Sequence, residues 1–437
     1  MSPDTTLVAD LRAEVLASLS ERERELAGAG RPPLGAADEQ ALGRQLIAEA
    51  LERRVTDALR NGSGVLPASE EDELSRAVFD ALFRLNHLQR LLDDPSIENI
   101  NANGCDQVWV RYADGRREQA APIASSDAEL EEMLRTAAAR VGIGERRFDR
   151  GSPRLSLQLP DGSRLFALMA VAARPCLSVR RHRYLRVTPD DLMAMGTLDL
   201  ALRELVRAAM AARKSCIICG GTGAGKTTLL RAMAADIAPS ERLVTIEDSL
   251  ELGLDRFPDL HPDVVALEAR EPNLEGEGAV SLAELVRWAL RMSPDRVIVG
   301  EARGEEVLAL LNAMSQGTDG SMATLHASSS KGAFSKLATY AVQAPERLPL
   351  EATNLLVANA VSFVVHLAQD GERRFVSSVR EVVDADGPMV VSNEVFRPGP
   401  AGRAVPGAPL RNDTLDQLAA VGFDPGLLER PQGWWET

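Results

Sequence analysis

The apolar and polar positions of the first 94 residues repeat with the period of an α-helix. Apolar residues recur three or four positions apart in three stretches, which polar or Gly/Pro-rich segments separate. The pattern predicts one helix up to a break at 28–35 and two more over roughly 38–61 and 69–92. The apolar faces fit either a small bundle or a solvated arm that contacts other subunits, and the pattern leaves both alternatives open.

Between residues 95 and 185 the period changes to that of β-strands. Residues 107–112 and 155–159 alternate apolar and polar side chains, and an Asp-Gly pair follows each run. Alternation that ends at Asp-Gly is typical of β-hairpins. A helical pattern at 127–141 interrupts the strands, so a small α+β domain is predicted over 95–185. Residues 186–195 are then predicted to be a linker.

From residue 196 to about 370 short apolar runs alternate with helical segments. This alternation predicts an α/β fold, in which helices cover both faces of a parallel sheet. Residues 373–396 have the pattern of a terminal hairpin, so this domain is predicted to span 196–396. Because seven of the thirteen residues at 397–409 are Pro or Gly, the segment 397–437 is predicted to be a flexible tail.

The composition is that of a globular protein with an acidic excess. The 437 residues are 45% hydrophobic, and 64 acidic against 49 basic side chains give a formal charge of −15. Such a charge repels a phosphodiester backbone, so no nucleic-acid partner is expected. The longest uncharged apolar stretch, 165–173, has nine residues, well below the ~20 that a membrane-spanning helix needs. Since the N-terminus also lacks the pattern of a secretion signal, we expect a cytoplasmic protein that reaches a membrane only through partners.

Two of the four cysteines, Cys216 and Cys219, have the C-x-x-C spacing of redox and zinc sites. Both lie in a strand-like run, where residues three apart face opposite sides of a sheet and cannot bridge. No second pair completes a zinc site. The two cysteines are therefore predicted to be core residues.

A phosphate-binding loop is the most specific chemical signal in the chain. Residues 220–227 fill every position of the pattern G-x-x-x-x-G-K-[ST] directly after the apolar run 215–219. Such a loop directs its N–H groups at phosphate oxygens from the positive end of the next helix, although a glycine-rich turn before an ordinary helix is the alternative. Lys226 is predicted to reach the β- and γ-phosphates and Thr227 to hold Mg²⁺. The predicted nucleotide-binding residues of the loop are Gly220, Gly221, Thr222, Gly223, Ala224, Gly225, Lys226, Thr227 and Thr228.

Polar residues that follow strand-like runs supply the candidate catalytic groups, because ligands bind beyond the carboxyl ends of parallel strands. Besides Lys226, these residues are Glu247, Glu301 and His326, and we expect all four at one sheet edge. Glu301 is predicted to orient and deprotonate the attacking water. Glu247 either holds Mg²⁺ or shares the role of base, and His326 can donate to the γ-phosphate. The alternatives are solvated or helix-capping acids and a structural histidine. The predicted metal ligands are Thr227, Glu247 and Glu301.

Arginines add candidate phosphate contacts. Arg303 stands two residues beyond Glu301 and is predicted to face the same site. A helix that opens with the capping-box sequence at 281–284 places Arg287 and Arg291 on one outer face, where they can contact phosphate, a neighbouring subunit or only solvent. The run Arg-Arg-His-Arg at 180–183 fits either a phosphate-facing cluster or an ordinary solvated one.

These residues resemble the ATPases of the type II/type IV secretion superfamily, and within it the CpaF/TadA branch, which powers tight-adherence (Flp-type) pilus assembly. The resemblance runs from about residue 75 to 396. It rests on the phosphate loop and on three further blocks, namely 245–248 (the Asp box), 285–304 (the Walker B block) and 319–327 (the His box). The chain departs from the family at Thr318, where a histidine is frequent, and at Ala266, where an arginine is common.

The resemblance implies a homohexameric ring in which a small sensor-like (PAS-like) domain precedes a RecA-like ATPase domain, with ATP and Mg²⁺ between them. In the family, arginines at the positions of Arg180, Arg181 and Arg183 close over the nucleotide, and inner-membrane platform proteins receive the motion. The expected function is an ATP-hydrolysing motor for pilus or secretion-system assembly at the cytoplasmic membrane face. A nucleic-acid translocase is disfavoured by the charge, and a non-hydrolysing scaffold by the catalytic set.

Overall fold

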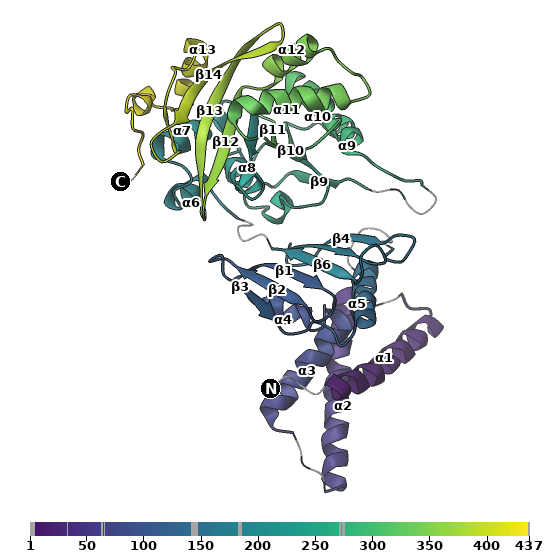
Figure 1. Cartoon of the computed structure of the whole chain (residues 1–437). Helices are drawn as coiled ribbons and strands as arrows, with labels where there is room; N and C mark the ends of the chain where they lie inside the picture. The colour runs from purple at the N-terminus through teal and green to yellow at the C-terminus, as the bar shows by residue number, and fades with distance from the viewer. Residues whose placement is uncertain are drawn as a thin grey trace. The chain divides into compact units, whose positions relative to one another are not determined.

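The computed structural model of the chain describes residues 5–32, 34–62, 64, 66–140, 147–181, 186–270, 272 and 276–435 (Figure 1). The chain divides into two compact units, Met1–Arg181 and His182–Thr437. Each unit has its own apolar core, so each is described by itself.

The first unit begins with a helical bundle and not with a solvated arm. Three long helices share an apolar cluster that includes Leu11, Val15, Ile47, Leu74 and Val78, as the apolar stripes of the sequence require. The predicted third helix, however, is interrupted. Its chain leaves the helix after Phe83, and Asn86 adopts a left-handed φ of 47°, which breaks the helical hydrogen bonding. The helices are α1 (Thr5–Gly28), α2 (Ala36–Arg60), α3 (Ala68–Phe83) and α4 (Leu88–Asp93).

A six-stranded antiparallel sheet completes the first unit, with strand order β3-β2-β1-β6-β5-β4. Both hairpins expected from the Asp-Gly pairs are present, as β2 with β3 and β4 with β5. Leu130 and Leu134 of α5 (Asp127–Arg140) pack into the core on one sheet face. The strands are β1 (Ile97–Asn103), β2 (Val108–Tyr112), β3 (Arg117–Ala120), β4 (Arg154–Gln158), β5 (Arg164–Leu168) and β6 (Cys176–Arg180).

The second unit has the α/β fold that the sequence predicts. Its nine-stranded sheet has the order β15-β14-β13-β12-β7-β11-β10-β8-β9. The six strands from β12 to β9 are parallel, and β13, β14 and β15 extend the sheet in antiparallel fashion, so the sheet is mixed. The strands are β7 (Cys216–Gly220), β8 (Leu243–Glu247), β9 (Val264–Glu268), β10 (Arg296–Ala302), β11 (Met322–His326), β12 (Phe363–Asp370), β13 (Arg373–Asp386), β14 (Met389–Pro398) and β15 (Ala404–Pro406).

Helices cover both faces of this sheet (Figure 1). One apolar core contains Cys216 and the other contains Cys219, so the two cysteines face opposite sides of β7 and the prediction that they are core residues is confirmed. One face carries α6 (Pro189–Ala194), α7 (Leu200–Ala211), α8 (Lys226–Ala235) and α13 (Asn412–Ala420), and the other carries α9 (Leu282–Ala289), α10 (Glu306–Ser315), α11 (Ser330–Gln343) and α12 (Leu350–Ala360).

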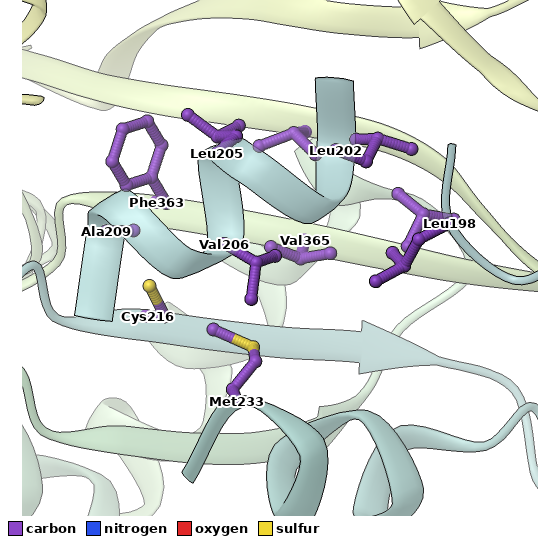
Figure 2. Close-up of a pocket in the computed structure, with 11 residues that line it drawn as sticks. Leu198, Leu202, Leu205, Val206, Ala209, Cys216, Met233, Phe363 and Val365 are labelled. Carbon is purple, nitrogen blue, oxygen red and sulfur yellow. The ribbon is translucent and has the colours of Figure 1, made fainter. Parts of the chain in front are cut away.

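The packing of α7 on the sheet shows how closely this core is filled. Leu202, Leu205 and Val206 of the helix surround the same small space as Phe363 and Val365 of β12 (Figure 2). The cavity between them measures about 10 Å³ and its lining is apolar. A space of that size and character stays dry and holds no ligand.

The predicted linker and the predicted flexible tail are both wrong for the described residues. Residues 189–194 form α6, which begins at a capping box of Thr188 and Asp191. After residue 397 the chain adds β15, α13 and a short 3-10 helix (Pro425–Leu428). Its Pro and Gly residues form turns between anchoring apolar side chains, and burial of the latter offsets the entropy of ordering the segment. These anchors are Leu410, Leu418, Phe423 and Leu427.

Within the described part of the chain, no helix combines the length and apolar character needed to cross a bilayer.

Candidate nucleotide-binding site

The phosphate loop joins β7 to α8 and adopts the turn that its glycines allow. Gly223 and Gly225 have φ values of 77° and 95°, in the left-handed region that favours glycine. Lys226 is the first residue of α8, and Thr227 and Thr228 follow in its first turn, partly exposed. The backbone of residues 220–228 therefore leads into a helix N-terminus, as an anion-binding loop requires.

The four predicted strand-end groups lie together. Because β7, β11, β10 and β8 are adjacent and parallel, their carboxyl ends meet at one edge. Lys226 Nζ lies 3.3 Å from His326 Nδ1, and His326 Nε2 lies 2.6 Å from Glu301 Oε1. Lys226 also donates to the carbonyl oxygens of Gly220 and Gly221, at 3.2 and 2.9 Å. An ammonium, an imidazole and a carboxylate thus form a continuous chain beside the loop.

Arg303 extends this chain beyond Glu301. Its Nη2 and Nε lie 2.7 and 2.9 Å from Glu301 Oε2, which is a bidentate arrangement on one oxygen. Its Nη1 also lies 3.5 Å from Asp248. The predicted proximity of Arg303 to Glu301 is therefore present, and the arginine fixes the orientation of the carboxylate.

The surroundings of His326 favour its neutral form. Burial and the neighbouring Lys226 ammonium lower the pKa of His326, while Glu301 opposes this shift. Because an ammonium can only donate, Nδ1 is the acceptor, and the ring proton is assigned to Nε2, next to Glu301. The contact between His326 Nε2 and Glu301 Oε1 is short but poorly directed. Glu301 Oε1 therefore accepts no hydrogen bond with good geometry from the described residues.

Glu247 lies at the same edge in a different environment. Its side chain is 3% exposed, and Oε2 accepts hydrogen bonds from the backbone N–H groups of Glu251 and Leu252, at 2.8 and 2.9 Å. Burial raises the pKa of Glu247 to about 7, although the two N–H donors oppose the shift. Oε1 is buried and has no hydrogen-bond partner among the described residues. One oxygen is thus positioned by the backbone while the other remains available.

Two arginines at the site were missed by the sequence reasoning. Arg231 of α8 is buried and donates to the carbonyl oxygens of Glu251 and, at 3.0 Å, Leu252. It therefore stabilises the loop whose backbone N–H groups bind Glu247. A charged residue inside an apolar helical run was the available signal. Arg374 of β13 donates from Nε to the carbonyl oxygen of Gly223, at 2.8 Å, and no sequence pattern distinguishes it from its neighbour Arg373.

The other predicted arginines are those of the run 180–183 together with Arg287 and Arg291. Arg181 donates to the carbonyl oxygens of Asp94 and, at 3.5 Å, Ile97, so its guanidinium serves the first unit. Arg180 is exposed at the end of β6, and Arg183 lies outside the described residues. Arg287 and Arg291 are exposed, as expected, and Arg287 lies 3.5 Å from Glu346.

The donor set fits a nucleotide with Mg²⁺. The loop offers N–H groups and an ammonium to phosphates, and Thr227 and Glu247 offer oxygen atoms of the kind Mg²⁺ prefers. No group of three or more His, Cys, Asp or Glu side chains that could hold a metal occurs among the described residues. A magnesium ion at this edge would therefore depend on phosphate oxygens and water as well as on the protein, which is its usual mode of binding.

Comparison with known proteins places the chain in a family. Over 313 residues it is 36% identical to a Mycobacterium tuberculosis (strain ATCC 25618 / H37Rv) protein named "Putative conjugal transfer protein Rv3659c", covering 69% of this chain and 85% of that one. It is 31% identical to the type IV secretion system protein PtlH of Bordetella pertussis (strain Tohama I), covering 68% and 94%. It is 30% identical to the type IV secretion system protein VirB11 of Brucella suis biovar 1, covering 68% and 89%.

Solved structures give matches of lower overall similarity. The crystal structure of the Brucella suis VirB11 ATPase in complex with sulphate is 31% identical and covers 70% of this chain and 96% of that one, with a TM-score of 0.37. The pilus retraction motor PilT with bound ADP is 17% identical and covers 77% and 88%, with a TM-score of 0.48. Because both scores are below 0.5, the assignment rests on sequence. The family model described as Type II/IV secretion system protein matches residues 84–396, which include every strand-end group of the site, and the chain belongs to this family.

Proposed function

We propose that this chain is an ATP-hydrolysing motor that powers assembly of a pilus or secretion system. The observation that carries the proposal is the contact chain from Lys226 through His326 to Glu301 at the mouth of the phosphate loop. A protein that only binds nucleotide needs the loop, whereas hydrolysis also needs a base that can take a proton from water. The names of the relatives, which include secretion ATPases and secretion-system proteins, support the same activity.

The residues of the chain have distinct roles in this reaction. The loop N–H groups and Lys226 bind the phosphates, and Glu301, fixed by Arg303, accepts the proton of the attacking water at Oε1. Neutral His326 donates from Nε2 and can report the loss of the γ-phosphate. Thr227 and Glu247 would hold Mg²⁺, which neutralises phosphate charge when bound. Since Glu301 lies at the same edge, it can also contact that ion through water.

The proposed oligomeric state, partners and type of pilus rest on the resemblance of the sequence blocks to the CpaF/TadA branch. These are a homohexamer that acts on platform proteins at the cytoplasmic face of the inner membrane, and a pilus of the tight-adherence type. Light scattering with ATP present should give a mass of about six subunits. A stable monomer would contradict the proposed ring. Strong stimulation of hydrolysis by single-stranded DNA would favour a translocase instead, a reading that the charge of −15 disfavours.

The base assignment is tested by the rate of ATP hydrolysis. Glu301→Gln keeps the size of the side chain but cannot accept the proton, so hydrolysis should fall about 10²-fold or more while nucleotide binding persists. Lys226→Ala should lose both binding and hydrolysis. Glu305→Gln, which removes an exposed carboxylate four residues away, is the matched control and should hydrolyse ATP like the wild type. Normal hydrolysis by Glu301→Gln would show that another group is the base.

A further inference from the structure

The β12–β13 hairpin lies along the phosphate loop on the side away from Glu301. Sheet order places β12 next to β7, opposite β11. Gly220 approaches β12 so closely that a Cβ atom there would lie 2.6 Å from the carbonyl oxygen of Leu367. Further along the loop, a Cβ atom on Gly223 would lie 3.7 Å from Gln369 Oε1. The end of the hairpin therefore flanks the loop over several residues.

Arg374 is the charged residue of this hairpin that faces the loop. It pairs across the hairpin with Gln369, and its Nε donates to the carbonyl oxygen of Gly223 at 2.8 Å. A Cβ atom on Gly225 would lie 3.4 Å from the Cδ atom of Arg374. The guanidinium is thus next to two of the glycines whose left-handed conformation shapes the loop. It is also only partly exposed.

Most of the binding capacity of this guanidinium is unused within the described residues. A guanidinium has five N–H donors, and only Nε has a hydrogen-bond partner there. No carboxylate among the described residues lies within ion-pair distance, in contrast to Arg380 of the same strand, whose Nη2 lies 3.1 Å from Glu394 Oε1. A partly buried, unpaired cation favours an anionic ligand, since charge-assisted hydrogen bonds repay its desolvation.

A second observation indicates that a ligand belongs at this strand edge. Glu247 Oε1 is buried and has no hydrogen-bond partner among the described residues, so an unused acceptor lies at the carboxyl end of β8. Arg374 and Glu247 are on opposite sides of β7 in the sheet order. The unused donors and the unused acceptor match a ligand that carries phosphates together with a cation.

We propose that Arg374 is a phosphate-binding residue of the nucleotide site. Its Nε holds the carbonyl of Gly223, and its remaining N–H groups bind oxygen atoms of the phosphate chain. The inference rests on the proposed nucleotide binding and adds to it an arginine from outside the four strand ends. Arg373, the exposed neighbour of equal charge, offers a matched control because successive strand residues face opposite sides.

The test is calorimetric titration of the full-length protein with ADP and with inorganic triphosphate, each with Mg²⁺. Arg374→Gln retains a donor for Gly223 but loses the charge, so both affinities should fall about tenfold or more. Arg374→Lys should recover part of this loss, and Arg373→Gln should bind both ligands within twofold of the wild type.

Three results would overturn the assignment. Unchanged ADP affinity in Arg374→Gln, with a lower unfolding temperature of the nucleotide-free protein, would leave Arg374 a purely structural role. If Arg374→Gln had a lower affinity for ADP but an unchanged affinity for triphosphate, Arg374 would contact the base or the ribose and not the phosphates. If the wild type bound neither ligand, the proposed nucleotide site itself would fail, a result distinct from the first two.

Discussion

At Glu247, burial of the side chain opposes ionisation of its carboxyl group. Two backbone N–H groups hold one carboxylate oxygen, whereas the other oxygen is buried without a hydrogen-bond partner among the described residues. Gly300 of the adjacent strand packs directly on it, since a Cβ atom there would lie 2.9 Å from Glu247 Cγ. The side chain is therefore closely packed on that side. Its oxygen needs a proton or a cation.

The raised pKa of Glu247 predicts a stability difference that depends on pH. Its pKa rises from 4.5 when exposed to about 7 in the folded protein. The folded state therefore binds more protons between these values. The stabilisation is present below pH 4.5 and is lost as the pH rises through 7, by about 3 kcal/mol in all. Glu247→Gln cannot ionise, so the difference in unfolding free energy, wild type minus variant, should fall between pH 5 and pH 8.

Urea denaturation without nucleotide or Mg²⁺ measures this difference. Glu305→Gln is a suitable control, because it removes an exposed carboxylate that is not among the groups shifting the pKa of Glu247. A difference that stays constant with pH would mean that Glu247 remains ionised or reaches water in solution. Addition of Mg²⁺ with nucleotide should reduce the pH dependence of this difference in unfolding free energy, because a bound cation favours the ionised form of Glu247.

The sequence predicted the positions of the candidate catalytic residues better than it predicted the residues that position them. Glu301 and His326 follow apolar strands, so the topology of a parallel sheet brings them together whatever the details of packing. Arg374 and Arg231 contact the site through backbone carbonyls. Such contacts depend on how a hairpin and a loop fold in three dimensions. No spacing rule encodes them.

At the scale of elements, local signals succeeded where they did not compete with packing. The capping box of Ser281 and Glu284 opens α9 as predicted, with both reciprocal hydrogen bonds present. The Asp-Gly hairpins formed as well. The segment after residue 397 was misjudged, because its Pro and Gly content suggested flexibility while its sparse apolar residues docked on a core formed far away in sequence. Composition alone does not reveal such docking.

The C-terminal segment is therefore expected to stabilise the second unit. Trp434 Nε1 donates to the carbonyl oxygen of Leu427 at 3.0 Å, and Trp435 Nε1 donates to the carbonyl oxygen of Ala404 at 2.7 Å. Trp434→Ala and Trp435→Ala should each lower the unfolding free energy by about 2 kcal/mol, less than for a fully buried tryptophan. Chemical denaturation followed by circular dichroism measures this. Trp288→Ala removes a side chain that is 49% exposed and should cost under ~0.5 kcal/mol. Wild-type stability in both C-terminal variants would show that the segment is dispensable.

At the scale of the whole molecule, the chain consists of two compact units. Their apolar cores share no residue. Calorimetry should therefore resolve two unfolding transitions if the two units differ in stability. The phosphate loop belongs to the second unit, so a nucleotide that binds only there should raise only that transition. At a concentration of 100 Kd the stabilisation amounts to about 2.7 kcal/mol.

A contribution of the first unit to nucleotide binding, as the resemblance implies, would change this outcome. Arg180 is exposed, whereas Arg181 is engaged with carbonyl oxygens of its own unit, so Arg180 is the arginine to test. If its guanidinium binds the nucleotide, Arg180→Ala should weaken ADP affinity about tenfold or more and reduce the ADP-induced shift of the second transition. Arg150→Ala, which removes another exposed arginine of the first unit, should leave both unchanged. Equal ADP affinity in the two variants would confine the nucleotide contacts to the second unit.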